Sequence, residues 1–357
     1  MNIKKYYPLA TLALFIILFQ VFSTLTAQEF YLTQFTMAAY YSLVVIGLSV
    51  LLGYAGQISI GHAAFFAIGG YTTAVLTTIN LIQYNDNPLI QFVVNYGLTS
   101  FKKDPYGVEI VYLSPWISLI LAISIAFIIS FLIGIPILKL KGHYLAMATL
   151  GFGTIIYRVT LGSHIFGEAD GISDVPSFNM IPGLTVSGDT SMRIENYYIA
   201  WFIVILIVII MLNLINSRVG RALRSIHGSE EAASAMGINT SRYKLFIFVL
   251  SAVIAAIGGV FLTHFNGGIG PSEAGVMKSV RYVAIVAVGG MANLWGVLIM
   301  SLILNFISLR GYLGSFDDAF FGLILIVFIM FFPDGIFKRD NYKMVLKYIK
   351  NLKNLVK

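Results

Sequence analysis

The chain contains no cysteine, which excludes disulfide bonds, thiolate metal sites and a cysteine nucleophile. It is also poor in charge, since 11% of its 357 residues are Asp, Glu, Lys or Arg, against about 25% in soluble domains. No zinc-protease, nucleophile-elbow or P-loop motif occurs in it. Because the chain lacks a loop that cradles phosphates, we expect any ATP-driven work to be done by another polypeptide.

Metal and nucleic-acid binding have little support either. None of the five histidines pairs with another at i, i+4 spacing. His164 stands near Glu168 and Asp170, an arrangement that we interpret as a solvated loop and not as a metal site. The net charge of +7 is not organised into basic runs interleaved with stacking aromatics, so it does not indicate nucleic acid. We expect no metal and no cofactor on this chain.

What the chain has in abundance is apolar sequence. Hydrophobic residues make up 58% of it, and the mean hydropathy is +0.86. A spanning helix needs about 20 mostly apolar residues. Ten segments approach this, at 7–27, 34–52, 60–80, 115–138, 144–162, 198–215, 245–265, 280–292, 294–310 and 318–333. Their apolar runs do not alternate as barrel strands would, so we predict an all-α transmembrane bundle of about ten helices.

The basic residues predict its orientation. With the N-terminus in the cytoplasm, 16 of the 23 Lys and Arg residues fall in cytoplasmic loops and termini, as the positive-inside rule requires. This places both termini inside, exterior loops at 80–114 and 163–197, and a cytoplasmic loop at 216–244. The transmembrane domain then covers 1–340, and 341–357 is a basic cytoplasmic tail. Lys4 and Lys5 before an apolar run also resemble a signal peptide, but the count of crossings requires a retained first helix.

The cytoplasmic loop 216–244 has the pattern of a short exposed helix. Ser229 suits an N-cap, acidic residues follow it, and Gly237 provides a stop. Its apolar strip favours docking on a soluble partner over a merely solvated hairpin. The candidate coupling residues are Arg218, Gly220, Arg221, Arg224, Glu231, Ala232, Ala233, Met236 and Gly237.

Two glycine-rich stretches, at 53–71 and 141–153, interrupt apolar sequence with small and polar residues. Unwound backbone at membrane depth is tolerated only against protein or a water-filled cavity, so one interpretation is a broken helix beside a translocation path. The other is close packing of small residues plus a short cytoplasmic turn, and the sequence leaves both open. The candidate path residues are Gly53, Gly56, Gln57, Ser59, Gly61, His62, Thr149, Gly151 and Gly153.

Four motifs carry a resemblance to a known family. They are G-Y-A-G-Q-I-S-I-G-H-A-A-F at 53–65, L-K-G-H-Y-L-A and T-L-G-F-G at 140–153, G-E-A-D-G-I-S-D-V-P at 167–176, and G-R-A-L-R-S-I leading to E-A-A-x-x-x-G-I at 220–238. In this order they resemble the permease subunit of a branched-chain amino-acid ABC importer of the LivM type. The sequence departs from the family pattern in two places: the distal Leu-Pro of the longest coupling-loop motif is missing, and the extension at 80–114 is additional.

The resemblance implies an importer of the type II fold in a bacterial cytoplasmic membrane, with leucine, isoleucine and valine as solutes. It implies a second, LivH-type permease, two ATPase subunits that bind ATP and Mg²⁺, and a periplasmic or lipid-anchored binding protein. That protein would dock on the exterior loops, which hold 12 of the 16 acidic residues. The candidate docking residues are Glu168, Asp170 and Asp174.

Two alternatives stay open at this stage. One is an ABC permease for another small solute, such as urea, short amides or nucleosides. The other is a secondary transporter or channel, which would need acidic or histidine relays within the membrane for ion coupling. Every Asp and Glu is predicted to lie in a loop or a terminus, which argues against that second alternative.

Overall fold

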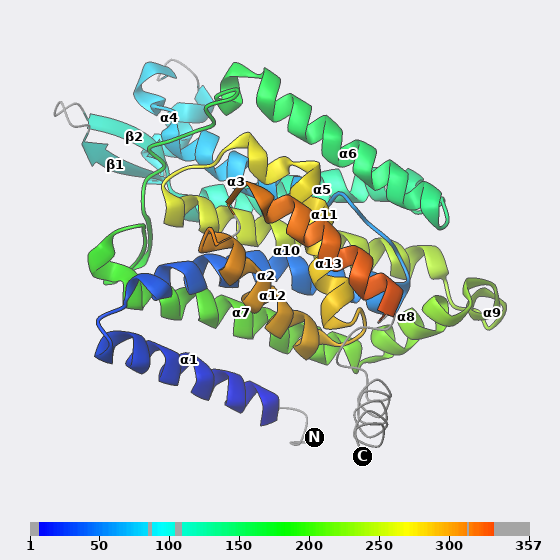
Figure 1. The fold of residues 1–357 in the computed structure, drawn as a ribbon. Helices are drawn as coiled ribbons and strands as arrows, with labels where there is room; N and C mark the ends of the chain where they lie inside the picture. The colour runs from blue at the N-terminus through cyan, green and yellow to red at the C-terminus, as the bar shows by residue number, and fades with distance from the viewer. Residues whose placement is uncertain (1–6, 85–87, 104–108, 313, 332–357) are drawn as a thin grey trace.

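The computed structural model describes residues 7–84, 88–103, 109–312 and 314–331. They form a bundle of helices that run along one common direction (Figure 1). Six helices in this part of the chain are long and apolar enough to cross a membrane. They are α1 (Tyr7–Leu25), α2 (Phe30–Ala55), α5 (Pro115–Ile137), α6 (His143–Gly162), α7 (Arg193–Ile215) and α10 (Thr240–Asn266).

Four shorter helices complete the bundle. They are α3 (His62–Thr78), α11 (Val276–Gly289), α12 (Leu294–Leu309) and α13 (Asp317–Phe331). Each of the ten predicted apolar segments therefore contains one helix, although the number that cross a bilayer stays a prediction. The predicted basic tail at 341–357 lies outside the described residues.

Helix α2 is the centre of the bundle. It is apolar around its whole circumference, and every residue from Ala38 to Gly53 is buried, as expected of a helix surrounded by others. It packs against α7, α10, α11 and α12. Helix α1 shows the opposite behaviour, because only Ile16 and Ser23 are buried in it and it lies at the edge of the bundle (Figure 1). Its exposed apolar residues suit contact with lipid.

The fold is helical but not all-α. Strands β1 (Thr99–Lys103) and β2 (Glu109–Leu113) form one antiparallel hairpin, and β3 (Phe178–Ile181) and β4 (Leu184–Val186) form a second one with an irregular register. The short helix α4 (Pro88–Asn95) lies beside the first hairpin (Figure 1). Both hairpins fall in the predicted exterior loops, where strands of three to five residues are too short to show alternation. The second loop is also shorter than predicted, because α7 begins at Arg193.

The opposite end of the bundle carries α8 (Arg218–Gly228) and α9 (Glu230–Ala235), which project from it (Figure 1). The first described residues of α1 and the last of α13 lie at this same end. This arrangement agrees with the predicted placing of the loop 216–244 and both termini on one side. We refer to it as the coupling end, and to the end that carries the hairpins as the hairpin end.

Candidate coupling surface and translocation path

Helix α9 forms where the capping pattern predicted it. The Ser229 hydroxyl accepts a hydrogen bond from the backbone N–H of Ala232 at 3.2 Å. Glu230 and Glu231 occupy the first turn, where the helix dipole favours acidic groups. Gly237 follows the helix with φ at +82°, a backbone conformation that residues other than glycine rarely adopt. The predicted short helix is confirmed, and it runs from Glu230 to Ala235, one residue short of its predicted end at Met236.

The two faces of α9 differ in exposure. Ala233 is fully buried against its own chain, so it anchors the helix and is not available to a partner. Ala232 is exposed and the side chain of Met236 is 70% exposed, one turn apart on the same flank. The apolar strip that a partner can reach therefore consists of Ala232 and Met236, narrower than the three residues named from sequence.

The arginines of α8 also divide into two groups. All three arginines, Arg218, Arg221 and Arg224, are exposed, but Arg224 turns back and donates to the carbonyl oxygen of Ile215 at 2.7 Å. Its guanidinium lies 5.5 Å from the ring centroid of Tyr54. A Cβ at Gly220 would lie 2.1 Å from the same Ile215 oxygen, so this glycine lets α8 pack directly on the end of α7. Arg224 and Gly220 hold the coupling loop in place, and Arg218 and Arg221 stay free to contact another protein.

Ion pairs tie α9 to the bundle. The ammonium of Lys244, near the start of α10, lies 2.7 Å from the Glu230 carboxylate and donates to the carbonyl oxygen of Leu138 at 3.2 Å. Burial acts to raise the pKa of Glu230, but its hydrogen bonds to Lys244 and Thr240 and the positive charges of Lys244 and Lys141 outweigh this and hold the pKa below its ordinary 4.5. The Glu231–Lys141 pair, at 3.8 Å between exposed side chains, contributes little. A displacement of α9 must therefore pull on the ends of α5 and α10.

A polar pocket of about 310 Å³ lies behind this surface. Its walls come from the start of α10, the turn between α5 and α6, the α8–α9 junction and the segment after α2, and they include Gln57, Lys141, His227, Glu230 and Lys244. Gln57 is 3% exposed, and neither the nitrogen nor the oxygen of its side-chain amide has a hydrogen-bond partner. The pocket thus joins the coupling helix to the first of the glycine-rich stretches.

That stretch leaves the helical conformation over residues 56–61. Gly56 ends α2 with φ at +66°, and the chain then runs along α6. The N–H of Ile60 donates to the Thr149 hydroxyl at 3.0 Å, and a Cβ at Gly61 would lie 2.3 Å from the carbonyl oxygen of Thr149. A Cβ at Gly153 would lie 3.5 Å from the Cα of Gly61, an ordinary van der Waals distance. Gly61 is therefore required for the close approach of this irregular segment to α6, whereas Gly153 is not.

Helix α3 consequently begins inside the bundle. Ser59 and both ring nitrogens of His62 form a buried chain of hydrogen bonds to Ser251, at 2.8 and 2.9 Å. Ser251 is about 17 Å along α10 at 1.5 Å per residue. The two interpretations of the sequence are therefore combined: the segment starts as a turn at the coupling end and continues inward as unwound backbone. Ser59 and His62 form hydrogen bonds with each other and with Ser251 of α10, so they hold this segment in place.

The remaining two candidate path glycines differ in their surroundings: one packs against backbone, and the other borders open space. A Cβ at Gly53 would lie 1.9 Å from the carbonyl oxygen of Met291, so Gly53 packs against the α11–α12 turn. The Tyr54 hydroxyl donates to Ala292 there at 2.8 Å. A Cβ at Gly151, by contrast, would meet nothing within 4 Å. The side of α6 at Gly151 is therefore not covered by other parts of this chain.

At the hairpin end, the loop 163–192 carries the three candidate docking acids. Asp170 and Asp174 are exposed, and the half-buried Glu168 pairs with His164 at 3.1 Å. No group of three potential metal ligands occurs in the described part of the chain. Backbone hydrogen bonds between Ile172 and Ile269, both at 2.9 Å, fix the loop to the segment after α10. The acids are thus presented on a braced surface.

Sequence reasoning missed one feature, between α10 and α11. Residues 266–279 were assigned to an exterior loop, but a short 3₁₀ turn (η5, Pro271–Ala274) brings Glu273 to Tyr41, whose hydroxyl donates to it at 3.0 Å. Lys278 pairs with the same carboxylate at 3.0 Å. Tyr41 is about 17 Å from the outer end of α2 at 1.5 Å per residue. Glu273 therefore lies in a connecting segment, as predicted for every Asp and Glu, but this segment folds back against the middle of α2.

Residues 30–330 match the family model for the permease component of branched-chain amino acid transport systems. The chain belongs to this family. Such a permease is a multi-pass membrane transport subunit and not an enzyme. The resemblance drawn from four motifs is thereby confirmed, and it extends beyond them to nearly all the described helices.

Individual relatives agree with this assignment. The permease is 27% identical to the high-affinity branched-chain amino acid transport system permease protein LivM of Salmonella typhimurium, over 87% of this chain and 71% of that protein. It is 24% identical to LivH of Escherichia coli and to BraD of Pseudomonas aeruginosa, in each case over 87% of this chain and 95% of the relative. No solved structure matches the permease.

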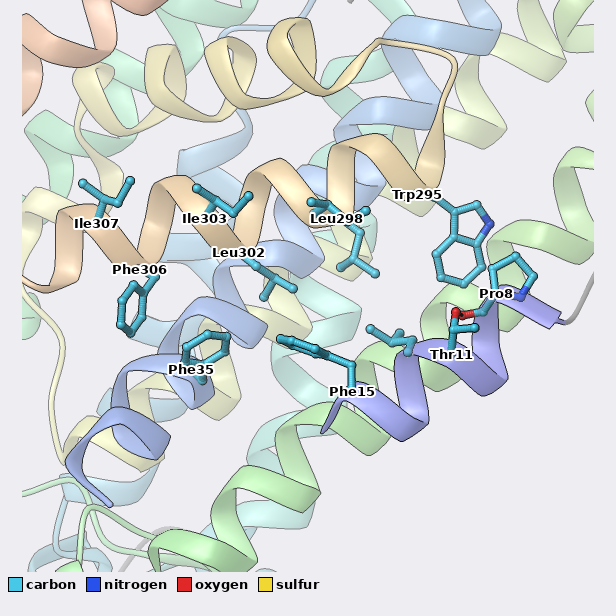
Figure 2. Close-up of a pocket in the computed structure, with 12 residues that line it drawn as sticks. Pro8, Thr11, Phe15, Phe35, Trp295, Leu298, Leu302, Ile303, Phe306 and Ile307 are labelled. Atoms are coloured by element: carbon cyan, nitrogen blue, oxygen red, sulfur yellow. Dashed lines mark hydrogen bonds between the residues drawn. The ribbon is translucent and has the colours of Figure 1, made fainter. Parts of the chain in front are cut away.

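A large hollow in the permease is apolar and opens at the side of the bundle. It has a volume of about 740 Å³ and lies between α1, α2 and α12. Phe15, Phe35 and Leu302 point into it, and Trp295 stands at its far end beside Pro8 (Figure 2). A zwitterionic solute would find no charged group among its lining residues. Such a groove suits hydrocarbon and not the translocated amino acid.

Proposed function

We propose that this permease forms part of the translocation path for branched-chain amino acids in an ATP-driven importer of the type II fold. Its ten helices would cross the cytoplasmic membrane of a bacterium with both termini inside. The sister subunit would be a LivH-type permease. Two ATPase subunits would bind ATP and Mg²⁺, and a periplasmic or lipid-anchored protein would deliver the solute to the loop that carries Glu168, Asp170 and Asp174.

The observation that carries the proposal is the construction of α9. A short helix that exposes Ala232 and Met236 while its buried face is tied through Glu230 to Lys244 has the features of a lever. A partner that grips the exposed flank moves the ends of α5 and α10 and the pocket lined by Gln57. ATP can shift the bundle only by its different affinity for the two states of the ATPase pair.

The same linkage predicts which part of the permease moves. When the ATPase pair closes, α9 would be displaced, and the segment 56–61 would move with it because the polar pocket joins the two. That segment is not helical, and hydrogen bonds join it to Thr149 of α6 and, through His62, to Ser251 of α10, so a shift of either helix would carry it along. We expect it to change conformation between the inward- and outward-facing states.

Uptake by the reconstituted complex tests the proposal. The permease is co-expressed with its partner subunits, inserted into liposomes that contain ATP, and supplied with loaded binding protein and labelled leucine. We expect leucine to accumulate only with ATP, and isoleucine and valine to compete with it. Transport of urea or a nucleoside in place of these amino acids would refute the assigned solute, and accumulation without the ATPase subunits would refute the assigned energy source.

A further inference from the structure

The Glu273–Lys278 pair has an unusual environment for an ion pair inside a membrane protein. One carboxylate oxygen of Glu273 accepts from Lys278 and from the Tyr41 hydroxyl, both at 3.0 Å. Lys278 lies 3.2 Å from that hydroxyl and 4.6 Å from the centroid of the Tyr41 ring. The three groups thus form a closed triangle on a single oxygen, and the second carboxylate oxygen takes no part in it.

Unpartnered polar atoms surround this triangle. The second carboxylate oxygen of Glu273 is buried without a hydrogen-bond partner, and so are the hydroxyls of Tyr71 and Tyr282. Tyr71 is 2% exposed and Tyr282 is 1% exposed, and the charge of Glu273 acts on both. Leaving a buried polar group unpaired destabilises the folded state. Three such groups around one carboxylate indicate a polar ligand that completes them.

The pair is reachable from one side. The side chains of Glu273 and Lys278 keep 16% and 24% of their exposure, and Ser272 and Met277 next to them are exposed. Charged groups at membrane depth face a bundle interior or a water-filled cavity, because exposing them to lipid is costly. This face of η5 and α11 therefore borders water or another subunit, which is where a translocation path would run.

A neighbouring cation, Arg281, has more partners than Lys278, although its Nε and one carboxylate oxygen of Asp317 are also buried without a hydrogen-bond partner. Arg281, one turn further along α11, is held by Asp317 at 2.6 Å, by Asp318 at 3.1 Å and by the Ser308 hydroxyl at 2.6 Å. The guanidinium of Arg281 pairs with two carboxylates. Lys278 pairs with one oxygen of a single carboxylate, and the Tyr41 hydroxyl donates to that same oxygen. Lys278 can thus exchange part of its pairing with an incoming carboxylate, and Arg281 cannot do so without losing a better site.

An apolar patch adjoins the charged groups. Tyr71 and Ala274, the latter next to Glu273 in sequence, pack in a small buried cluster with Ala67, Ala74 and Ile269. Each of these residues is at most 7% exposed, so the cluster packs behind the charged groups and is not a free surface. Charged groups and apolar packing therefore lie next to each other, as the two parts of an aliphatic amino acid do.

We propose that Glu273, Lys278, Tyr71 and Tyr282 form a subsite for the charged backbone of an α-amino acid on its way through the bundle, an inference that rests on the proposed transport function. The ammonium group pairs with the free oxygen of Glu273, and the carboxylate takes hydrogen bonds from Lys278 and the tyrosine hydroxyls. A simple cation would leave Lys278 unmatched, and a simple anion would be repelled by Glu273. A zwitterion satisfies both and keeps the site neutral.

The absence of native cysteine makes the test clean. Ser272→Cys places a thiol beside Glu273, and the complex in nanodiscs, without binding protein, is alkylated with a water-soluble maleimide that is quantified on this chain by mass spectrometry. Saturating leucine is expected to slow alkylation about tenfold, as occupancy of a site at about ten times its Kd requires. Leucinamide, which lacks the carboxylate, and 4-methylpentanoate, which lacks the ammonium group, are expected to protect much less.

Charge-removing variants then separate recognition from packing. In the Ser272→Cys background, Glu273→Gln and Lys278→Met are expected to abolish protection by leucine, whereas Glu195→Gln, an exposed acid at the start of α7, leaves it unchanged. Met277→Cys, at a side chain that is 60% exposed, is a second reporter. Monodisperse elution of each variant shows that it has folded.

The outcomes decide between explanations. Equal protection by the three compounds, protection that survives Glu273→Gln, protection by sodium ions alone, or lack of reaction at both reporters would overturn the subsite. Failure of the proposed function appears elsewhere, as a wild-type complex that accumulates no branched-chain amino acid. A complex that transports leucine but shows no protection leaves the function standing and refutes only the subsite.

Discussion

Replacing Ala232 by glutamate is expected to lower solute-stimulated ATP hydrolysis by the complex more than about tenfold. The side chain lies on the exposed flank of α9, and a carboxylate there would be buried against the apolar groove of a partner. A single uncompensated charge in an interface costs several kcal/mol, and about 1.4 kcal/mol corresponds to a factor of ten. The measurement is ATPase activity with and without loaded binding protein.

The matched control for this substitution lies on the same helix. Ser234 is also exposed, but two residues further on, so it occupies roughly the opposite flank. Ser234→Glu adds the same charge and is expected to retain most of the stimulation. Similar losses in both variants would indicate that added charge, and not the Ala232 flank, disturbs the complex. Full activity in Ala232→Glu would remove α9 from the coupling surface.

A second large effect is expected where α3 crosses α10. A Cβ at Gly259 would lie 1.9 Å from the carbonyl oxygen of Phe66, and one at Gly69 would lie 2.2 Å from that of Ala256. Both obstacles are backbone, which cannot move aside as a flexible side chain can. Overpacking typically costs about 1–3 kcal/mol and sometimes more. Gly259→Val is therefore expected to force these two helices apart.

Thermal stability of the purified permease measures this effect. At a few degrees per kcal/mol for a chain of this size, the melting temperature of Gly259→Val is expected to fall by about 5 °C or more. Gly151→Val is the control, because it is also in a helix but has open space where its Cβ would lie. A melting temperature for Gly259→Val that equals that of the control would contradict the close crossing.

Structural features that depend on residues close together in the sequence could be predicted. Ser229, the acids after it and Gly237 lie within nine residues of one another, so α9 could be placed to within one residue. The helices in the apolar segments could be predicted equally well, because hydropathy depends on composition alone. The orientation of single residues was not: Ala233 and Ala232 are identical and adjacent, and only packing against α8 and α10 decides that Ala233 is the buried one.

Non-local contacts account for most of what was missed. Glu273 and Lys278 read as a polar exterior loop because the partner that draws them inward, Tyr41, is 232 residues away from Glu273. Glycines show the same limit. The sequence marked both Gly61 and Gly151 as candidates for one role, and only the position of α6 shows that Gly61 makes a close contact and Gly151 does not.

The central claim is that partner ATPases move this permease by holding α9 on the cytoplasmic side. Met236→Cys supplies one thiol, on a side chain that is 70% exposed, in a chain with no other cysteine. In sealed vesicles, an impermeant maleimide is expected to label it only when the cytoplasmic face is outward, and bound ATPase subunits are expected to block the label. Labelling from the exterior face, or labelling that the ATPase subunits do not affect, would contradict the account.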